Sequence, residues 1–216
     1  ARENGGGISA TLQSKISVVD SNFADCTAIN GKGGAIFSVE NTDLTVQSST
    51  LDSCIAKEAG GVYVEKMEHN TKVKNSVLKN CSATGTVGGG GIRAFNTRNI
   101  YIDCTIFANN DAFYGGGGGI YWSFPKNAMG TSTLESPIFF QTCQLLPQLG
   151  SLTPTSGIDP ADFFIGNKAS YGEKIASGPV TIIQTGGPSL DTTSSFTSKD
   201  SYFGTHVEFQ TSTELQ

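Results

Sequence analysis

Short runs in which apolar and polar residues alternate recur along the first half of the chain. Clear examples occupy residues 15–18, 43–46 and 99–102, where Ile16, Leu44 and Ile100 are each followed two positions later by another aliphatic residue. A period of two places alternate side chains on opposite faces of an extended strand. No segment keeps helical spacing over three turns, so the pattern predicts an all-β protein.

Two further signals recur in phase with these runs. The first is a glycine block of the type Gly33-Gly34-Ala35-Ile36, which begins at residues 5, 33, 60, 89 and 117, so that its spacings are 28, 27, 29 and 28. The second is a large apolar residue, two others, cysteine or asparagine, one more residue and alanine. It occupies residues 23–28, 51–56, 78–83, 107–112 and 164–169. Such periodicity indicates a solenoid, a propeller or an array.

The length of the period distinguishes these architectures. A propeller blade needs about 40 residues for its four strands, whereas a coil of a parallel β-helix closes in fewer. We therefore predict a single-stranded parallel β-helix (β-solenoid) with about 27–29 residues per coil. Equivalent residues of successive coils should form ladders about 4.8 Å apart. The expected core ladders are Ile16, Leu44, Thr71, Ile100 and Phe139; Phe23, Leu51, Leu78 and Phe107; and Ala28, Ala56, Ala83, Ala112 and Ala169.

Glycine and asparagine are the expected turn residues of each coil. We predict that Gly34, Gly61, Gly90 and Gly118 take positive φ at a sharp corner and let one coil lie close to the next. Asn110 and Asn167 should bond neighbouring backbone amides from a turn position, and they tolerate left-handed conformation.

The Gly-Gly-Ala-Ile and Phe-x-x-Asn motifs resemble the repeats of chlamydial polymorphic membrane proteins and of large protist surface proteins. The resemblance covers roughly residues 5 to 178, although cysteine stands at 26, 54 and 81 where the family has asparagine. It implies a right-handed parallel β-helix in a secreted or cell-surface protein with an adhesive or structural role. No catalytic residues come with it.

The repeat pattern also divides the chain. Residues 1–178 are expected to form the coils, with insertions near residues 124–135 and 147–163 that are candidate contact surfaces. Residues 179–216 lose the pattern and read as an irregular β tail, which would cap the stack or link it to a next module.

The five cysteines align with the repeat. Cys26, Cys54 and Cys81 share one ladder, while Cys104 and Cys143 occupy equivalent positions in two matching phrases. Ladder neighbours lie within the Cα separation that a disulfide can bridge. We predict a Cys104–Cys143 disulfide and a second bond from Cys54 to either Cys26 or Cys81. The alternative is a stack of reduced, buried cysteines.

Composition adds few functional signals. Net charge is −5, which provides no basic surface for nucleic acid, and no run of 18 apolar residues could span a membrane. Asn80-Cys81-Ser82 is a glycosylation acceptor whose asparagine should point outward. Asn41-Thr42-Asp43 looks like the first motif of polygalacturonases, but the remaining motifs are missing. We therefore expect no catalytic site and no cofactor. We also expect no metal site, because no two cysteines are separated by only two residues.

These observations favour a non-catalytic, extracellular or cell-surface module. We expect a structural role, with the chain assembling end to end into a filament or joining neighbouring domains of a larger surface protein. The first alternative is an adhesin that binds a host protein or a glycan. The second alternative is a degenerate polysaccharide lyase or hydrolase. The structure should distinguish these three classes. A filament module should have both ends paired with neighbours, an adhesin should have projecting insertions, and an enzyme should have a groove with paired acids.

Overall fold

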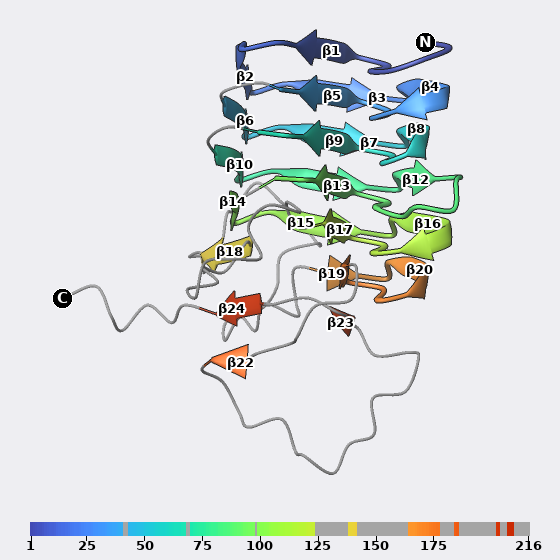
Figure 1. Cartoon of the computed structure of the whole chain (residues 1–216), viewed down its shortest axis with the longest axis vertical. Coiled ribbons are helices and arrows are strands. Elements are labelled where there is room, and N and C mark those ends of the chain that lie inside the picture. Colours follow the sequence, from blue (N-terminus) through green and yellow to red (C-terminus); the bar gives the residue numbers. More distant parts are fainter. Residues whose placement is uncertain are drawn as a thin grey trace, which may run out of the picture.

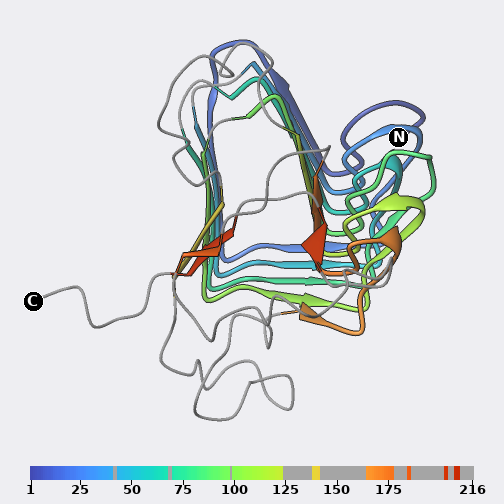
Figure 2. The same cartoon turned by 60° about the horizontal axis from the view of Figure 1, so that its bottom comes forward.

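The computed structural model describes residues 1–40, 43–67, 70–97, 99–123, 138–141, 164–177, 184–185, 202–203 and 207–209. Every regular element in these residues is a β-strand, and every strand pairing is parallel. Figure 1 shows the coils stacked one above another, and Figure 2 shows them superimposed in an oblique view along the stack. The chain is therefore an all-β parallel β-solenoid, as the repeat predicts. Its right-handedness stays a prediction.

Four parallel sheets run along the stack, and each of the first five coils contributes one strand to each sheet in turn. Sheet A contains β1 (Ile8–Thr11), β5 (Ile36–Val39), β9 (Val62–Glu65), β13 (Ile92–Phe95), β17 (Ile120–Ser123), β21 (Ile175–Ser177) and β23 (Tyr202–Phe203). Sheet B contains β2 (Lys15–Val19), β6 (Asp43–Gln47), β10 (Asn70–Lys74), β14 (Asn99–Asp103), β18 (Ile138–Gln141), β24 (Val207–Phe209) and β22 (Gln184–Thr185).

The two remaining sheets have five strands each. Sheet C contains β3 (Asn22–Ala24), β7 (Thr50–Asp52), β11 (Val77–Lys79), β15 (Ile106–Ala108) and β19 (Phe164–Ile165). Sheet D contains β4 (Thr27–Lys32), β8 (Ile55–Glu58), β12 (Ser82–Ala83), β16 (Asp111–Gly116) and β20 (Lys168–Tyr171). The predicted insertions near residues 124–135 and 147–163 lie outside the described residues. From the predicted tail, β22, β23 and β24 join sheets A and B.

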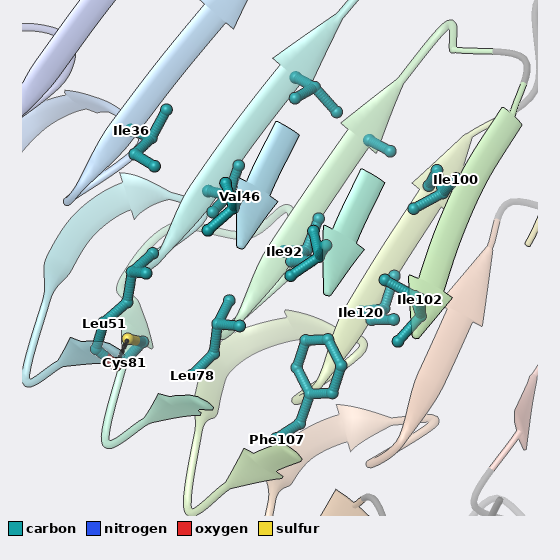
Figure 3. Close-up of a cluster of buried hydrophobic side chains, with 14 of the residues drawn as sticks. Ile36, Val46, Leu51, Leu78, Cys81, Ile92, Ile100, Ile102, Phe107 and Ile120 are labelled. Carbon is teal, nitrogen blue, oxygen red and sulfur yellow. Dashed lines mark hydrogen bonds between the residues drawn. The ribbon is translucent and has the colours of Figure 1, made fainter. Parts of the chain in front are cut away.

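Side chains that alternate inward fill the space between the sheets with aliphatic ladders. The register confirms the predicted alanine ladder and extends the aromatic and leucine ladder through Phe107 to Phe164, whose rings stack 5.0 Å apart. Figure 3 shows Leu51, Leu78 and Phe107 in line on successive coils. The predicted position of Phe139 is wrong: Ile138 pairs with Ile100, while Phe139 pairs with Tyr101. Counting across an insertion shifted the register by one residue, which exchanges the two faces of a strand.

Each corner of the coil is made by residues with left-handed backbone. At the corner between sheets C and D these are Asp25, Ser53, Asn80, Asn109 and Gly166, one per coil. At the corner between sheets D and A they are Gly5, Gly33, Ala59, Gly89, Gly117 and Gly172. A single left-handed residue turns the chain sharply, and glycine does so without the steric cost that a Cβ adds.

The predicted positive φ at Gly34, Gly61, Gly90 and Gly118 is wrong, because the residues at φ > 0 precede them. These four glycines serve close packing instead. A Cβ on Gly34 would meet the carbonyl oxygen of Gly60 in the next coil, and a Cβ on Gly61 would lie 2.5 Å from that of Gly91. The third glycine block is also displaced by one, because Val62 pairs with Ile36 and Ala59 occupies the left-handed position.

Candidate functional site

One polar ladder runs through the corner between sheets C and D. Its members are Cys26, Cys54, Cys81, Asn110 and Asn167, each placed between the C strand and the D strand of its coil. The residue before each of them has positive φ, and the left-handed turn directs the following side chain inward. Four of the five are buried and Cys26 is half-buried. The sequence predicts this column correctly from the second motif.

The asparagines connect each coil to the coil before it. Asn110 Nδ2 donates to the carbonyl oxygen of Leu78 at 2.9 Å, and its Oδ1 accepts the backbone N–H of Cys81 at 2.9 Å. Asn167 repeats the pattern with the Phe107 carbonyl at 2.9 Å and the Asn110 N–H at 3.0 Å. The predicted bonds to neighbouring amides are therefore confirmed. The left-handed residues are Asn109 and Gly166, not the two ladder asparagines.

The cysteines take the same place with weaker bonds. Cys81 Sγ donates to the carbonyl oxygens of Lys79 at 3.3 Å and Leu51 at 3.6 Å. Cys54 Sγ makes the equivalent contacts with Asp52 at 3.4 Å and Phe23 at 3.8 Å. The Leu51 and Phe23 carbonyls correspond to the Leu78 carbonyl that Asn110 bonds, so the thiol substitutes for the amide donor. Sulfur is a weak donor and a weak acceptor, and a cysteine should hold adjacent coils less tightly than an asparagine.

The three thiols also interact with one another. Hydrogen bonding with the Cys81 thiol lowers the pKa of Cys54 despite its burial, and the same bond together with burial raises the pKa of Cys81. Burial and the neighbouring Cys54 raise the pKa of Cys26. Cys54 lies in the middle of the ladder and interacts with both of the other thiols.

The predicted disulfides are not present in this structure. Cys26, Cys54, Cys81 and Cys104 are all free thiols, and Cys143 lies outside the described residues. In an in-register ladder, equivalent atoms of adjacent strands lie about 4.8 Å apart and parallel Cβ vectors keep them there. A disulfide needs sulfurs about 2.05 Å apart and Cβ atoms about 3.8 Å apart. The disulfide prediction was therefore wrong because it used the Cα separation alone. The structure has the alternative given above, a stack of reduced cysteines.

Asn80 lies at the outer side of the same corner. Its backbone has positive φ and its side chain is exposed, where Nδ2 donates to Asp52 Oδ1 at 2.9 Å. Asp52 also forms an ion pair with Lys79 at 3.1 Å. The outward direction predicted for Asn80 is confirmed. Its glycosylation stays a prediction.

A second polar cluster, which the sequence interpretation missed, covers the outer face of sheet A. Phe37, Tyr63, Arg93 and Tyr121 form one outward column, and Phe37 and Tyr63 stack with ring centroids 5.6 Å apart. The guanidinium carbon of Arg93 lies 5.7 Å from the Tyr63 ring centroid and 5.4 Å from that of Tyr121. These four positions recur at the coil period, so aromatic residues at the repeat spacing were the sequence signal that could have predicted this cluster.

Charges complete this outer cluster. Arg93 pairs with Glu58 at 3.2 Å although its side chain is only 8 % exposed, and Lys32 Nζ lies 3.5 Å from Glu65. The Tyr63 hydroxyl donates to Glu65 at 2.8 Å. Burial and the Glu65 carboxylate raise the pKa of Tyr63 far above its usual range. The positive and negative members balance, which is typical of a network that fixes structure.

The described residues contain no group of three or more His, Cys, Asp or Glu side chains that converges on a metal position. They also contain no helix that could cross a membrane. Asp43, from the pectinase-like triplet, accepts the backbone N–H of Asn70 at 3.4 Å, while residues 41 and 42 lie outside the described residues. No family model, curated protein or solved structure matches this chain.

Proposed function

We propose that this chain is a non-catalytic structural module of an extracellular or cell-surface protein, and that its coil stack continues into a further coil. The observation that supports this role is the open face of the first coil. Among the described strands, β1, β2 and β3 are edge strands of their sheets. Their inward residues Ile8, Ile16 and Phe23 are half-buried, whereas Ile36, Leu44 and Leu51 in the next coil are fully buried.

The chain covers one side of this face itself. The amino group of Ala1 donates to the carbonyl oxygen of Thr27 at 2.6 Å, and the N–H of Asn30 donates to the carbonyl oxygen of Arg2. The N–H of Lys32 donates to Asn4 Oδ1 at 2.9 Å. Residues 1–4 therefore lie along β4 and leave the edges of β1, β2 and β3 as the open part of the coil.

A coil with the same cross-section fits such an edge. Each described coil pairs with the next through in-register parallel strands and continuous apolar ladders. An added coil would extend these ladders and satisfy the backbone groups of the edge. In a solution of the isolated chain, the available coil comes from a second copy. Head-to-tail repetition of one such contact does not close and produces a fibre.

The test is the assembly state of the isolated chain, measured by sedimentation over a range of concentrations. Wild type should form species larger than a monomer as its concentration rises. Ile16→Lys should remain monomeric yet folded, because the lysine amine reaches water through an open face but would be buried by a docked coil. The matched variant Leu44→Lys places the same charge one coil deeper, so it should unfold the stack at every concentration. A wild-type chain that stays monomeric, or an Ile16→Lys chain that assembles like wild type, would contradict the proposal.

Exposed residues on sheet D favour one alternative, an adhesive role. Phe113 and Tyr114 on β16 are 55 % and 69 % exposed, and their ring centroids lie 6.5 Å apart. Two neighbouring exposed aromatic rings can stack on a sugar or pack against a protein. Binding to a glycan array by wild type, lost in Phe113→Ser/Tyr114→Ser, would support this role. Equal binding by the double variant would exclude these rings as the contact.

The surface location is supported by the exposed acceptor at Asn80, which leaves room for a glycan outside the stack. Expression through a eukaryotic secretory route should add one glycan at this position. Mass spectrometry that finds Asn80 unmodified in the secreted, folded protein would count against the glycoprotein assignment.

A further inference from the structure

The fold brings together three thiols that the sequence separates by 28 and 27 residues. The residues that follow them, Thr27, Ile55 and Ser82, are paired in register, so Cys26, Cys54 and Cys81 lie one above another. All three are free thiols, and Cys54 and Cys81 are fully buried. Sequence reasoning expects no metal site because closely spaced cysteines are missing. Stacking of the coils brings the three thiols close together, although they are far apart along the chain.

The separation of adjacent sulfurs suits a particular kind of ion. Parallel side chains on neighbouring coils place equivalent atoms about 4.8 Å apart. A metal–thiolate bond is about 2.3 Å long, so an ion midway between two sulfurs spans about 4.6 Å in a straight line. Three sulfurs in a row do not surround a point, which is why no tetrahedral site for zinc forms here. Only an ion that accepts two ligands in line fits this spacing.

We propose that Cys26 and Cys54 bind one soft monovalent cation of the Cu(I) type, in linear two-coordinate geometry along the axis of the stack. Sulfur ligands select soft ions such as Cu(I) over harder divalent ions. Cys26 is half-buried at the open end of the ladder and provides the entry path. Cys81 is fully buried and lies one coil further than Cys54 from the open end of the ladder.

Binding of the ion releases protons from both thiols. Cu⁺ displaces one proton from the Cys54 thiol to solvent, and the resulting thiolate forms the first bond. The Cys26 thiol releases its proton to solvent in the same way and forms the second bond, because the thiolate and not the thiol is the metal ligand. One positive charge enters and two leave, so the two thiolates and the ion together carry one negative charge, and no oxidation occurs.

The proposal is tested by Cu(I) uptake from a coloured competing chelator, without oxygen and at a concentration where the chain is monomeric. The starting protein carries Cys104→Ser and Cys143→Ser, so that only the ladder thiols remain. It should remove one Cu(I) per chain from the chelator. Adding Cys54→Asn should abolish uptake, while adding Cys81→Asn should leave it unchanged. Asparagine is the natural residue of this ladder at 110 and 167, so both variants should keep the β-sheet signal in circular dichroism.

Three results would overturn the site. The starting protein could fail to compete for Cu(I), which would show that the thiol stack does not bind it. The Cys54→Asn variant could bind as much as its parent, which would place the ion elsewhere. Cys81→Asn could lose binding while Cys26→Asn retains it, which would contradict the assignment to Cys26. X-ray absorption of the loaded protein should show two sulfur neighbours, and a shell of three or more would also contradict the linear geometry.

Discussion

Replacing Cys81 with asparagine should stabilise the protein. In the structure the Cys81 thiol donates to the Leu51 carbonyl at 3.6 Å, while Asn110 in the next coil donates to Leu78 at 2.9 Å and accepts from the N–H of Cys81 at 2.9 Å. An asparagine at 81 would make the same two amide bonds with the Leu51 carbonyl and the N–H of Cys54. The equivalent buried position is an asparagine in two other coils, so the ladder already accommodates this side chain.

The magnitude follows from the bonds exchanged. A neutral hydrogen bond contributes about 1 kcal/mol net. Two amide bonds replace two weaker contacts of sulfur, so we expect the free energy of unfolding to rise by about 1 kcal/mol. For a chain of this length that corresponds to an increase in Tm of about 2–4 °C. The control, Cys81→Ala, removes both sulfur contacts and leaves a small cavity, so it should lose about 1–3 kcal/mol.

The assay is thermal and urea denaturation under reducing conditions, followed by circular dichroism. The expected order of stability is asparagine, cysteine, alanine at position 81. A Cys81→Asn protein no more stable than Cys81→Ala would refute the view that this ladder joins the coils through hydrogen bonds. Cys54→Asn offers an independent repeat one coil earlier, because its thiol makes equivalent contacts with Phe23 and Asp52.

Three further predictions address packing, charge and thiol reactivity. Gly34→Ala should lower the free energy of unfolding by about 1–3 kcal/mol, because its Cβ would meet the Gly60 carbonyl. Ala59→Gly should change it by less than about 1 kcal/mol, since relief of left-handed strain offsets the lost methyl group. Denaturation curves of the two variants beside wild type measure both effects. Arg93→Met should destabilise by about 1–3 kcal/mol by leaving Glu58 with only the 3.9 Å contact to Lys32, and adding Glu58→Gln should recover part of the loss if the charge pair is the cause. Because the folded pKa of Cys26 is raised, its alkylation in the Cys104→Ser/Cys143→Ser protein should reach half its maximum rate at a higher pH than in the same protein unfolded; an equal or lower midpoint would contradict this.

The repeat motifs were sufficient to predict the solenoid and two of its core ladders, because the alternation and the coil period are local and survive in every copy. The Phe23 and Ala28 columns are correct for this reason. The predicted register was wrong where a one-residue insertion leaves the composition of the repeat unchanged. Ala59 takes a left-handed position that glycine holds elsewhere, which shifted the third glycine block by one, and the insertion before Ile138 shifted another column.

The candidate site was predicted less completely. The ladder members are correct, but their bonding depends on side-chain direction, which the spacing of Cα atoms does not contain. The outer cluster around Arg93 depends on a contact between two sheets, in which Glu58 of β8 in sheet D pairs with Arg93 of β13 in sheet A. Two charged residues 35 positions apart carry no local signal of such a contact.

Hydrogen exchange of the first coil tests the structural role most directly. Peptides that contain β1, β2 and β3 should exchange quickly in the monomer and become protected as the concentration of the chain rises, while the amides of β6 and β10 should stay protected throughout. Protection of the first coil that is already complete in dilute monomer, and that does not change with concentration, would show that no further coil is needed to cover it and would contradict the proposed function.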